Sequence, residues 1–114
     1  MGRIRQQRVA EAVRDELSRM LQRELKDPRV GLASIVQVEL SQDFRHARVY
    51  VSVYGSAEEQ EQAMRALDGA RGWLRREIGR RLQLRYAPEL TFVADASIRH
   101  GAHIAELLRR IRED

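Results

Sequence analysis

Residues 33–54, ASIVQVELSQDFRHARVYVSVY, contain the two clearest strand patterns in the chain. Apolar and polar side chains alternate through residues 33–41 and again through residues 46–54. A period of two places one row of side chains against a core and the other toward solvent. Because the short segment SQDFRH joins the two runs, we expect an antiparallel hairpin.

Two helical patterns follow this hairpin toward the C-terminus. Ser56 and Glu59 have the spacing of a capping box, which predicts that a helix begins there. Gly69 and Gly72 weaken the helical pattern, so we expect the first helix to end and a second to begin at a glycine kink. The second helix has its apolar stripe at Leu74, Ile78 and Leu82.

Further patterns flank this central part of the chain. Residues 4–25 read as an amphipathic helix, which KDPRVG at residues 26–31 ends. Residues 88–94 read as a strand that opens at a proline, and residues 102–112 as a short terminal helix. The predicted order is α-β-β-α-α-β plus a final helix, an α+β fold with helices on one face of a three-stranded sheet.

Length and composition bound the class of protein. The chain has 114 residues, which fits one domain over residues 1–114, and nothing in it demands more than a monomer. It has no cysteine, no secretory signal pattern and no apolar run long enough to cross a bilayer. We therefore expect a cytoplasmic protein without a membrane partner.

Positive charge is segregated along the sequence. The net charge is +4, and residues 71–85 carry six arginines against one glutamate, whereas residues 56–68 are net acidic. Such a basic face predicts contact with nucleic acid, mainly through phosphate and shape. Arg71, Arg75 and Arg81 lie nearer the apolar stripe, so packing or ion pairing is their alternative role. The candidate RNA-binding residues are Arg3, Arg5, Arg8, Arg45, Arg48, Arg71, Arg75, Arg76, Arg80, Arg81 and Arg85.

Catalytic and metal-binding patterns are missing from the sequence. The histidines at 46, 100 and 103 have no third ligand or activated carboxylate spaced near them. There is no phosphate-binding loop, dinucleotide fingerprint or nucleophile elbow. We expect no catalytic residue, no metal and no cofactor.

Four segments, taken together and in order, resemble the ribosome-binding factor A family of bacteria. They are RVAEAVRDELSRMLQRELKDPRVG at 8–31, ARVYVSVYG at 47–55, ARGWLRREIGRRLQLRYAPELTFVAD at 70–95 and SIRHGAHIAELL at 97–108. The resemblance implies a type II KH-like fold, in which an Ala-x-Gly interhelical kink replaces the usual glycine-rich loop. Ala70, Arg71 and Gly72 match that kink.

The resemblance also implies a function and partners. Members of this family bind the small (30S) ribosomal subunit and its 16S rRNA, assist late maturation and processing of that RNA, and matter most in cold growth. Two other classes stay open on the residues alone. One is a generic KH-type protein that binds single-stranded RNA. The other is a protein-interaction module that uses the acidic helix at 56–68 or the terminal helix at 102–112.

Overall fold

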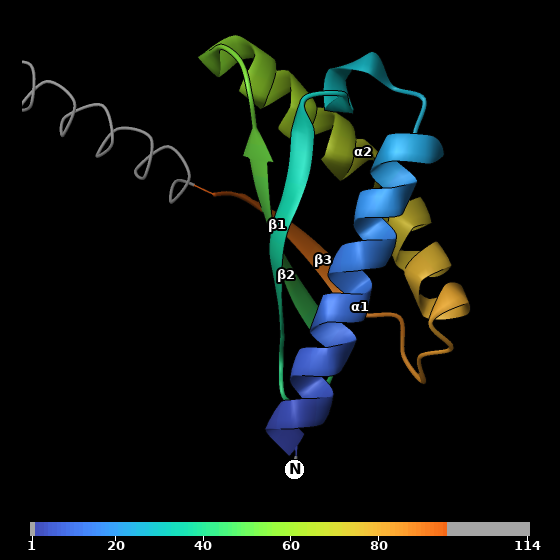
Figure 1. Ribbon diagram of the computed structural model, residues 1–114. Coiled ribbons are helices and arrows are strands. Elements are labelled where there is room, and N and C mark those ends of the chain that lie inside the picture. Colours follow the sequence, from blue (N-terminus) through green and yellow to red (C-terminus); the bar gives the residue numbers. More distant parts are fainter. Residues whose placement is uncertain (1, 96–114) are drawn as a thin grey trace, which may run out of the picture.

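The computed structural model describes residues 2–95 and shows two helices packed against one face of a small sheet (Figure 1). The final helix expected at 102–112 lies outside the described residues. The α+β class and the KH-like order expected from the sequence are confirmed. The elements are α1 (Gly2–Arg23), the 3-10 helix η1 (Pro28–Val30), β1 (Ala33–Leu40), β2 (His46–Val53), α2 (Ala57–Arg81) and β3 (Glu89–Ala94).

The sheet has the order β1-β2-β3. The expected hairpin is present, because β1 and β2 pair antiparallel, with Leu40 opposite Ala47. One irregularity in the register falls between Ile35 and Gln37. The last strand, β3, pairs parallel with β2, so that Ala47 also faces Leu90. As a result β2 is central, and the outer edge of β3 pairs with no other strand of the described chain.

The core lies between the sheet and the two helices. The central strand contributes Val49 and Val51, and their side chains are almost completely buried. These residues belong to the row that alternation assigns to the interior, and the same row of β3 contributes Leu90. Helical spacing places the facing side chains on single stripes of α1 and α2. Those stripes are Val13, Leu17 and Met20 on α1, and Leu67, Leu74 and Ile78 on α2.

Helix α2 begins as the sequence predicts. The backbone N–H of Glu59 donates to the Ser56 hydroxyl at 3.1 Å, and the Ser56 N–H donates to the Glu59 carboxylate at 3.0 Å. The two helices expected on either side of Gly69 and Gly72 are instead joined in one continuous helix from Ala57 to Arg81. Its buried stripe runs unbroken past both glycines, and this burial outweighs the roughly 1 kcal/mol that each glycine costs inside a helix.

The C-terminal end of α2 turns the chain toward β3. The N–H of Gln83 donates to the Arg80 carbonyl at 3.3 Å, and that of Leu84 donates to the Gly79 carbonyl at 3.0 Å. Gln83 has a φ of 52°, so the helix ends in a Schellman motif with a left-handed residue. The loop that follows reaches the buried Pro88 and then enters β3.

Candidate nucleic-acid interface

A groove separates α2 from β3. It is a shallow cavity of about 260 Å³, lined on the helix side by Arg71, Gly72 and Arg75. Glu89, Leu90 and Thr91 of β3 form its other wall. The groove therefore combines two arginines, a residue without a side chain and the outer edge of the sheet, which contributes one acid, Glu89. We call it the α2–β3 groove.

Ala70, Arg71 and Gly72, the expected interhelical kink, lie inside the continuous helix α2 rather than at a break. A Cβ added to Gly72 would meet only the tip of the Arg76 side chain, at 3.6 Å. The backbone at Gly72 is thus open to a ligand even though the helix is not interrupted there. Glycine allows a phosphate backbone to approach a helix more closely than any other residue does.

The arginines beside this groove differ in their partners. The Nε of Arg75 donates to the carbonyl of Ala87 at 3.1 Å, which holds the side chain against the loop before β3. The side chains of Arg71 and Arg76 are exposed and form no ion pair within residues 2–95. Their charge is therefore available to an external anion.

The next two arginines of α2 have carboxylate partners. Arg80 forms an ion pair with Glu77 at 2.8 Å. Arg81 contacts three carboxylates: Glu16 at 3.2 Å, Glu77 at 3.0 Å, and Glu24. The side chain of Arg81 is only 21% exposed. Ion pairing, the alternative role considered for Arg81, is thus what the structure shows, whereas the pairing of Arg80 was not expected.

These ion pairs shift the pKa values of the carboxylates and of Arg81. Hydrogen bonding from Arg81 lowers the pKa of Glu24 below its usual value. Hydrogen bonds from Arg80 and from Arg81 do the same to the pKa of Glu77. The pKa of Arg81 is raised, chiefly by its hydrogen bonds with Glu24. Arg81 consequently joins α2 to α1 and is less available to a ligand than Arg71 or Arg76.

A second group of candidate residues gathers at one end of the molecule. Figure 1 shows the start of α1, the β1–β2 turn and the α2–β3 loop at the lower end of the view. The Gln6 side chain of α1 donates to the carbonyl of Leu40. The guanidinium of Arg5 lies 5.8 Å from the centre of the Phe44 ring in the turn. Arg8 is exposed on the same helix, and the side chain of Arg3 lies outside the description.

Two further candidates meet at this end around an aromatic ring. The guanidinium carbons of Arg45 and Arg85 lie 4.7 and 5.6 Å from the centre of the Tyr86 ring. Tyr86 is not among the site residues predicted from the sequence. The available signal was an aromatic residue directly after a candidate arginine, in a segment that follows a helix.

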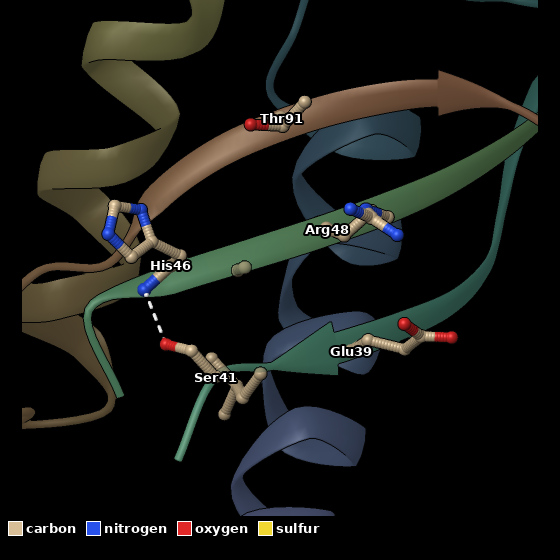
Figure 2. A pocket seen from close by; sticks show the side chains of 7 residues that line it. Glu39, Ser41, His46, Arg48 and Thr91 are labelled. Carbon is tan, nitrogen blue, oxygen red and sulfur yellow. Dashed lines mark hydrogen bonds between the residues drawn. The ribbon is translucent and has the colours of Figure 1, made fainter. Parts of the chain in front are cut away.

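Arg48 lies on the open face of the sheet, opposite Thr91, which lines both the groove and a second depression (Figure 2). Arg48 lines this depression of about 430 Å³ with Glu39, Ser41, His46 and Thr91. Hydrogen bonding with Tyr50, together with the charge of Glu39, raises the pKa of Arg48. This depression has one arginine against one glutamate, whereas the α2–β3 groove has two arginines against Glu89, so the groove is better suited to an anionic backbone.

Other kinds of site find little support in residues 2–95. Their His, Asp and Glu side chains do not gather into any group that could hold a metal ion. Nor does this part of the chain contain a helix long and apolar enough to cross a membrane.

Comparisons with known proteins identify relatives over most of the chain. The family model described as ribosome-binding factor A matches residues 5–108. The ribosome-binding factor A of Thermomicrobium roseum is 51% identical to this chain. The alignment covers the whole of this chain and 88% of the relative. The crystal structure of ribosome-binding factor A from Thermus thermophilus is also similar, with a TM-score of 0.70 and 30% sequence identity. The similarity covers 78% of this chain and 94% of that chain.

A second structural relative was placed in the map of a complex. It is a homology model of the Thermus thermophilus ribosome binding factor A, fitted into the cryo-electron microscopy map of a complex of that protein with the 30S subunit. The similarity covers 75% of this chain and 93% of that chain, with 33% identity and a TM-score of 0.57.

Proposed function

Because this chain belongs to the ribosome-binding factor A family, we propose that it is an assembly factor that binds the small ribosomal subunit through 16S ribosomal RNA. The observation that carries this proposal is the α2–β3 groove with its unpaired guanidinium groups. Arg71 lines the groove and Arg76 lies beside it, and neither is neutralised by a carboxylate of residues 2–95. An RNA backbone supplies the anionic partner that these groups lack.

The choice of the small subunit as partner is supported by the Thermus thermophilus relative, which was fitted into the map of its 30S complex. The shape of the groove supports RNA as the contacted component. One wall offers guanidinium groups and exposed helix backbone at Gly72, and the other is the outer edge of β3. This arrangement suits a phosphate backbone better than it suits an apolar protein surface.

Finer roles follow from the resemblance and form part of the same proposal. The protein supports late maturation and processing of 16S rRNA, leaves before translation begins, and is needed most during growth in the cold. It acts in the cytoplasm as a noncatalytic monomer.

A second candidate function is general binding of single-stranded RNA in the manner of KH domains. The outer edge of β3 favours it, because backbone groups there that pair with no other strand of the described chain can bond to bases. This function predicts tight binding of short oligonucleotides with a base preference. The assembly-factor function predicts weak binding of oligonucleotides and strong binding of the subunit.

Co-sedimentation of the purified protein with isolated small and large subunits tests the proposed function. We expect selective pelleting with the small subunit. The double variant Arg71→Gln, Arg76→Gln removes two charge-assisted contacts and should lower small-subunit affinity roughly 10- to 100-fold.

The matched control is the double variant Arg14→Gln, Arg65→Gln, which causes the same change in net charge outside the groove. Arg14 pairs with Asp15 at 3.3 Å and Arg65 with Glu61 at 2.8 Å. Circular dichroism should show both variants folded. Equal loss of affinity in both would mean that net charge alone matters, and the groove would not be the site.

A further inference from the structure

The ring of Tyr86 is not part of the core, although hydrogen bonds hold its loop to the β1–β2 turn and to α2. Tyr86 is 45% exposed, and it lies in the loop between α2 and β3. The guanidinium of Arg45 reaches it from the β1–β2 turn, with 4.7 Å between the guanidinium carbon and the ring centre. That of Arg85 lies 5.6 Å from the same centre. An aromatic plane and two cations from separate elements thus form one surface cluster.

Backbone contacts fix this cluster in place. The N–H of Glu89, at the start of β3, donates to the carbonyl of Arg45 at 2.8 Å, which ties the α2–β3 loop to the β1–β2 turn. The carbonyl of Ala87 accepts from the Arg75 side chain at 3.1 Å. The site is therefore formed before any ligand arrives, which reduces the entropy lost on binding.

The cations of the cluster form no ion pair within the described chain. Neither Arg45 nor Arg85 has a carboxylate within ion-pairing distance among residues 2–95. The nearest acid in sequence, Asp43, accepts from the Ser41 hydroxyl at 2.6 Å and from the Arg45 backbone N–H at 3.1 Å. By contrast, carboxylates pair with Arg14, Arg19, Arg29, Arg65, Arg80 and Arg81.

We propose that Arg45, Tyr86 and Arg85 form a stacking site for an unpaired base of RNA. A base stacks on the aromatic and guanidinium planes, and the guanidinium charges pair with the phosphates on either side. Every base has a π-face, so the site accepts any of the four bases. This proposal rests on the proposed function, to which it adds a contact of a different kind from those in the groove.

A cluster that only stabilised the loop would not need an exposed ring or unpaired charges. An acidic protein segment would use the charges but would draw little from the ring. The ring and the charges together favour a nucleotide. Stacking on the ring hardly depends on salt concentration, whereas contact with phosphate does. An experiment can therefore separate the contribution of the ring from that of the charges.

The test is the affinity of Tyr86→Ala for isolated small subunits, measured over a series of salt concentrations. We expect a loss of roughly 5- to 150-fold with an unchanged slope of log affinity against log salt. Tyr86→Phe keeps the ring and should bind like the unmodified protein. Tyr54→Ala is the control, because Tyr54 is 83% exposed and lies past the opposite end of β2.

The outcomes separate this site from the proposed function. If the unmodified protein does not bind small subunits, the proposed function fails. If it binds and Tyr86→Ala, shown to be folded by urea denaturation, binds equally well, the stacking site is overturned. Weak binding by Tyr86→Phe would also overturn it, because the hydroxyl and not the ring would then matter. A third result would also overturn it: Tyr86→Ala binds small subunits weakly but binds protein-free 16S rRNA as tightly as the unmodified protein does. The ring would then contact a ribosomal protein and not a base.

Discussion

The three glycines of α2 differ in what a side chain would meet at each position. A Cβ at Gly79 would lie 2.9 Å from the Cβ of Ala87, which is closer than real structures allow. At Gly69 a Cβ would meet no atom of the described chain within 4 Å. Gly79 is therefore required for the close packing of the α2–β3 loop on the helix, whereas Gly69 only weakens the helix.

We predict opposite effects of alanine at these two positions. Gly79→Ala should lower the free energy of unfolding by about 1–3 kcal/mol, because the loop must shift to make room. Gly69→Ala should raise the free energy of unfolding by roughly 0.5–1 kcal/mol, because alanine restricts the unfolded chain and favours the helix. Urea denaturation measures both. An unchanged stability of Gly79→Ala would show that the loop does not pack on the helix as described.

Tyr86 illustrates what sequence patterns leave out at the scale of single residues. Periodicity identifies the buried face of a helix or strand, but Tyr86 lies in a loop and has no period. Its partner Arg45 is distant in the sequence, and only the folded chain brings the two together. The candidate arginines of α2 could be named from composition, whereas their division into paired and unpaired side chains could not.

At the scale of elements, α2 carries acids in its first half and arginines in its second. Acids near the start of a helix and arginines near its end both complement the helix dipole, but this effect is limited to the first and last turns. Arg80 and Arg81 lie in the last turn, whereas Arg71 and Arg76 lie further inside the helix. The dipole therefore does not explain the unpaired arginines, whereas the proposed contact with RNA phosphates does.

The contact of α2 with the residue that follows α1, Glu24, should respond to acid. Because Arg81 lowers the folded-state pKa of Glu24 below its usual 4.5, ionised Glu24 stabilises the fold above that pH. This stabilisation is lost as the pH falls through the folded-state pKa. We predict that Glu24→Gln is less stable than the unmodified protein at pH 7, and that the difference shrinks below about pH 4.5.

Urea midpoints measured from pH 7 to pH 3 check this prediction. Glu58→Gln is a suitable control, because Glu58 is exposed in the first turn of α2 and contacts no arginine of the described chain. A difference between Glu24→Gln and the unmodified protein that stayed constant with pH would contradict the ion-pairing role.

The elements themselves were largely predictable. Alternation placed both strands of the hairpin within one residue of their observed ends, and the capping box placed the start of α2. The continuity of α2 was not predicted, because glycine is a local signal and the burial that overrides it is not. Leu67 and Leu74, on either side of the glycines, are both fully buried against the same core.

At the scale of the whole molecule, most arginines without carboxylate partners in the described chain gather beside the α2–β3 groove and at the end where the chain begins. They belong to α1, the β1–β2 turn, α2 and the α2–β3 loop, which are brought together only by the fold. The family could be named from the series of sequence segments, and the comparisons confirm it. The shape of the groove could not, since β3 and α2 form it from opposite sides. The exposed arginines at these two places whose guanidinium groups form neither an ion pair nor a hydrogen bond within the described residues are Arg5, Arg8, Arg45, Arg71, Arg76 and Arg85.

This distribution predicts a steep effect of salt on binding. If these arginines each contact one phosphate, log affinity for the small subunit should fall with log salt at a slope of about −4 to −5. Filter binding in a series from about 50 to about 200 mM KCl gives the slope. A slope near about −1 would mean that most of these arginines do not contact RNA.

The parallel pairing of β3 with β2 has a consequence for synthesis. Parallel strands need a long crossover, here the whole of α2, so β3 joins the sheet only after α2 has been made. While the chain is still emerging from the exit tunnel, the groove has one wall and Tyr86 has no fixed loop. The proposed RNA contacts in the groove and at Tyr86 therefore cannot be complete until β3 has been made and has joined the sheet.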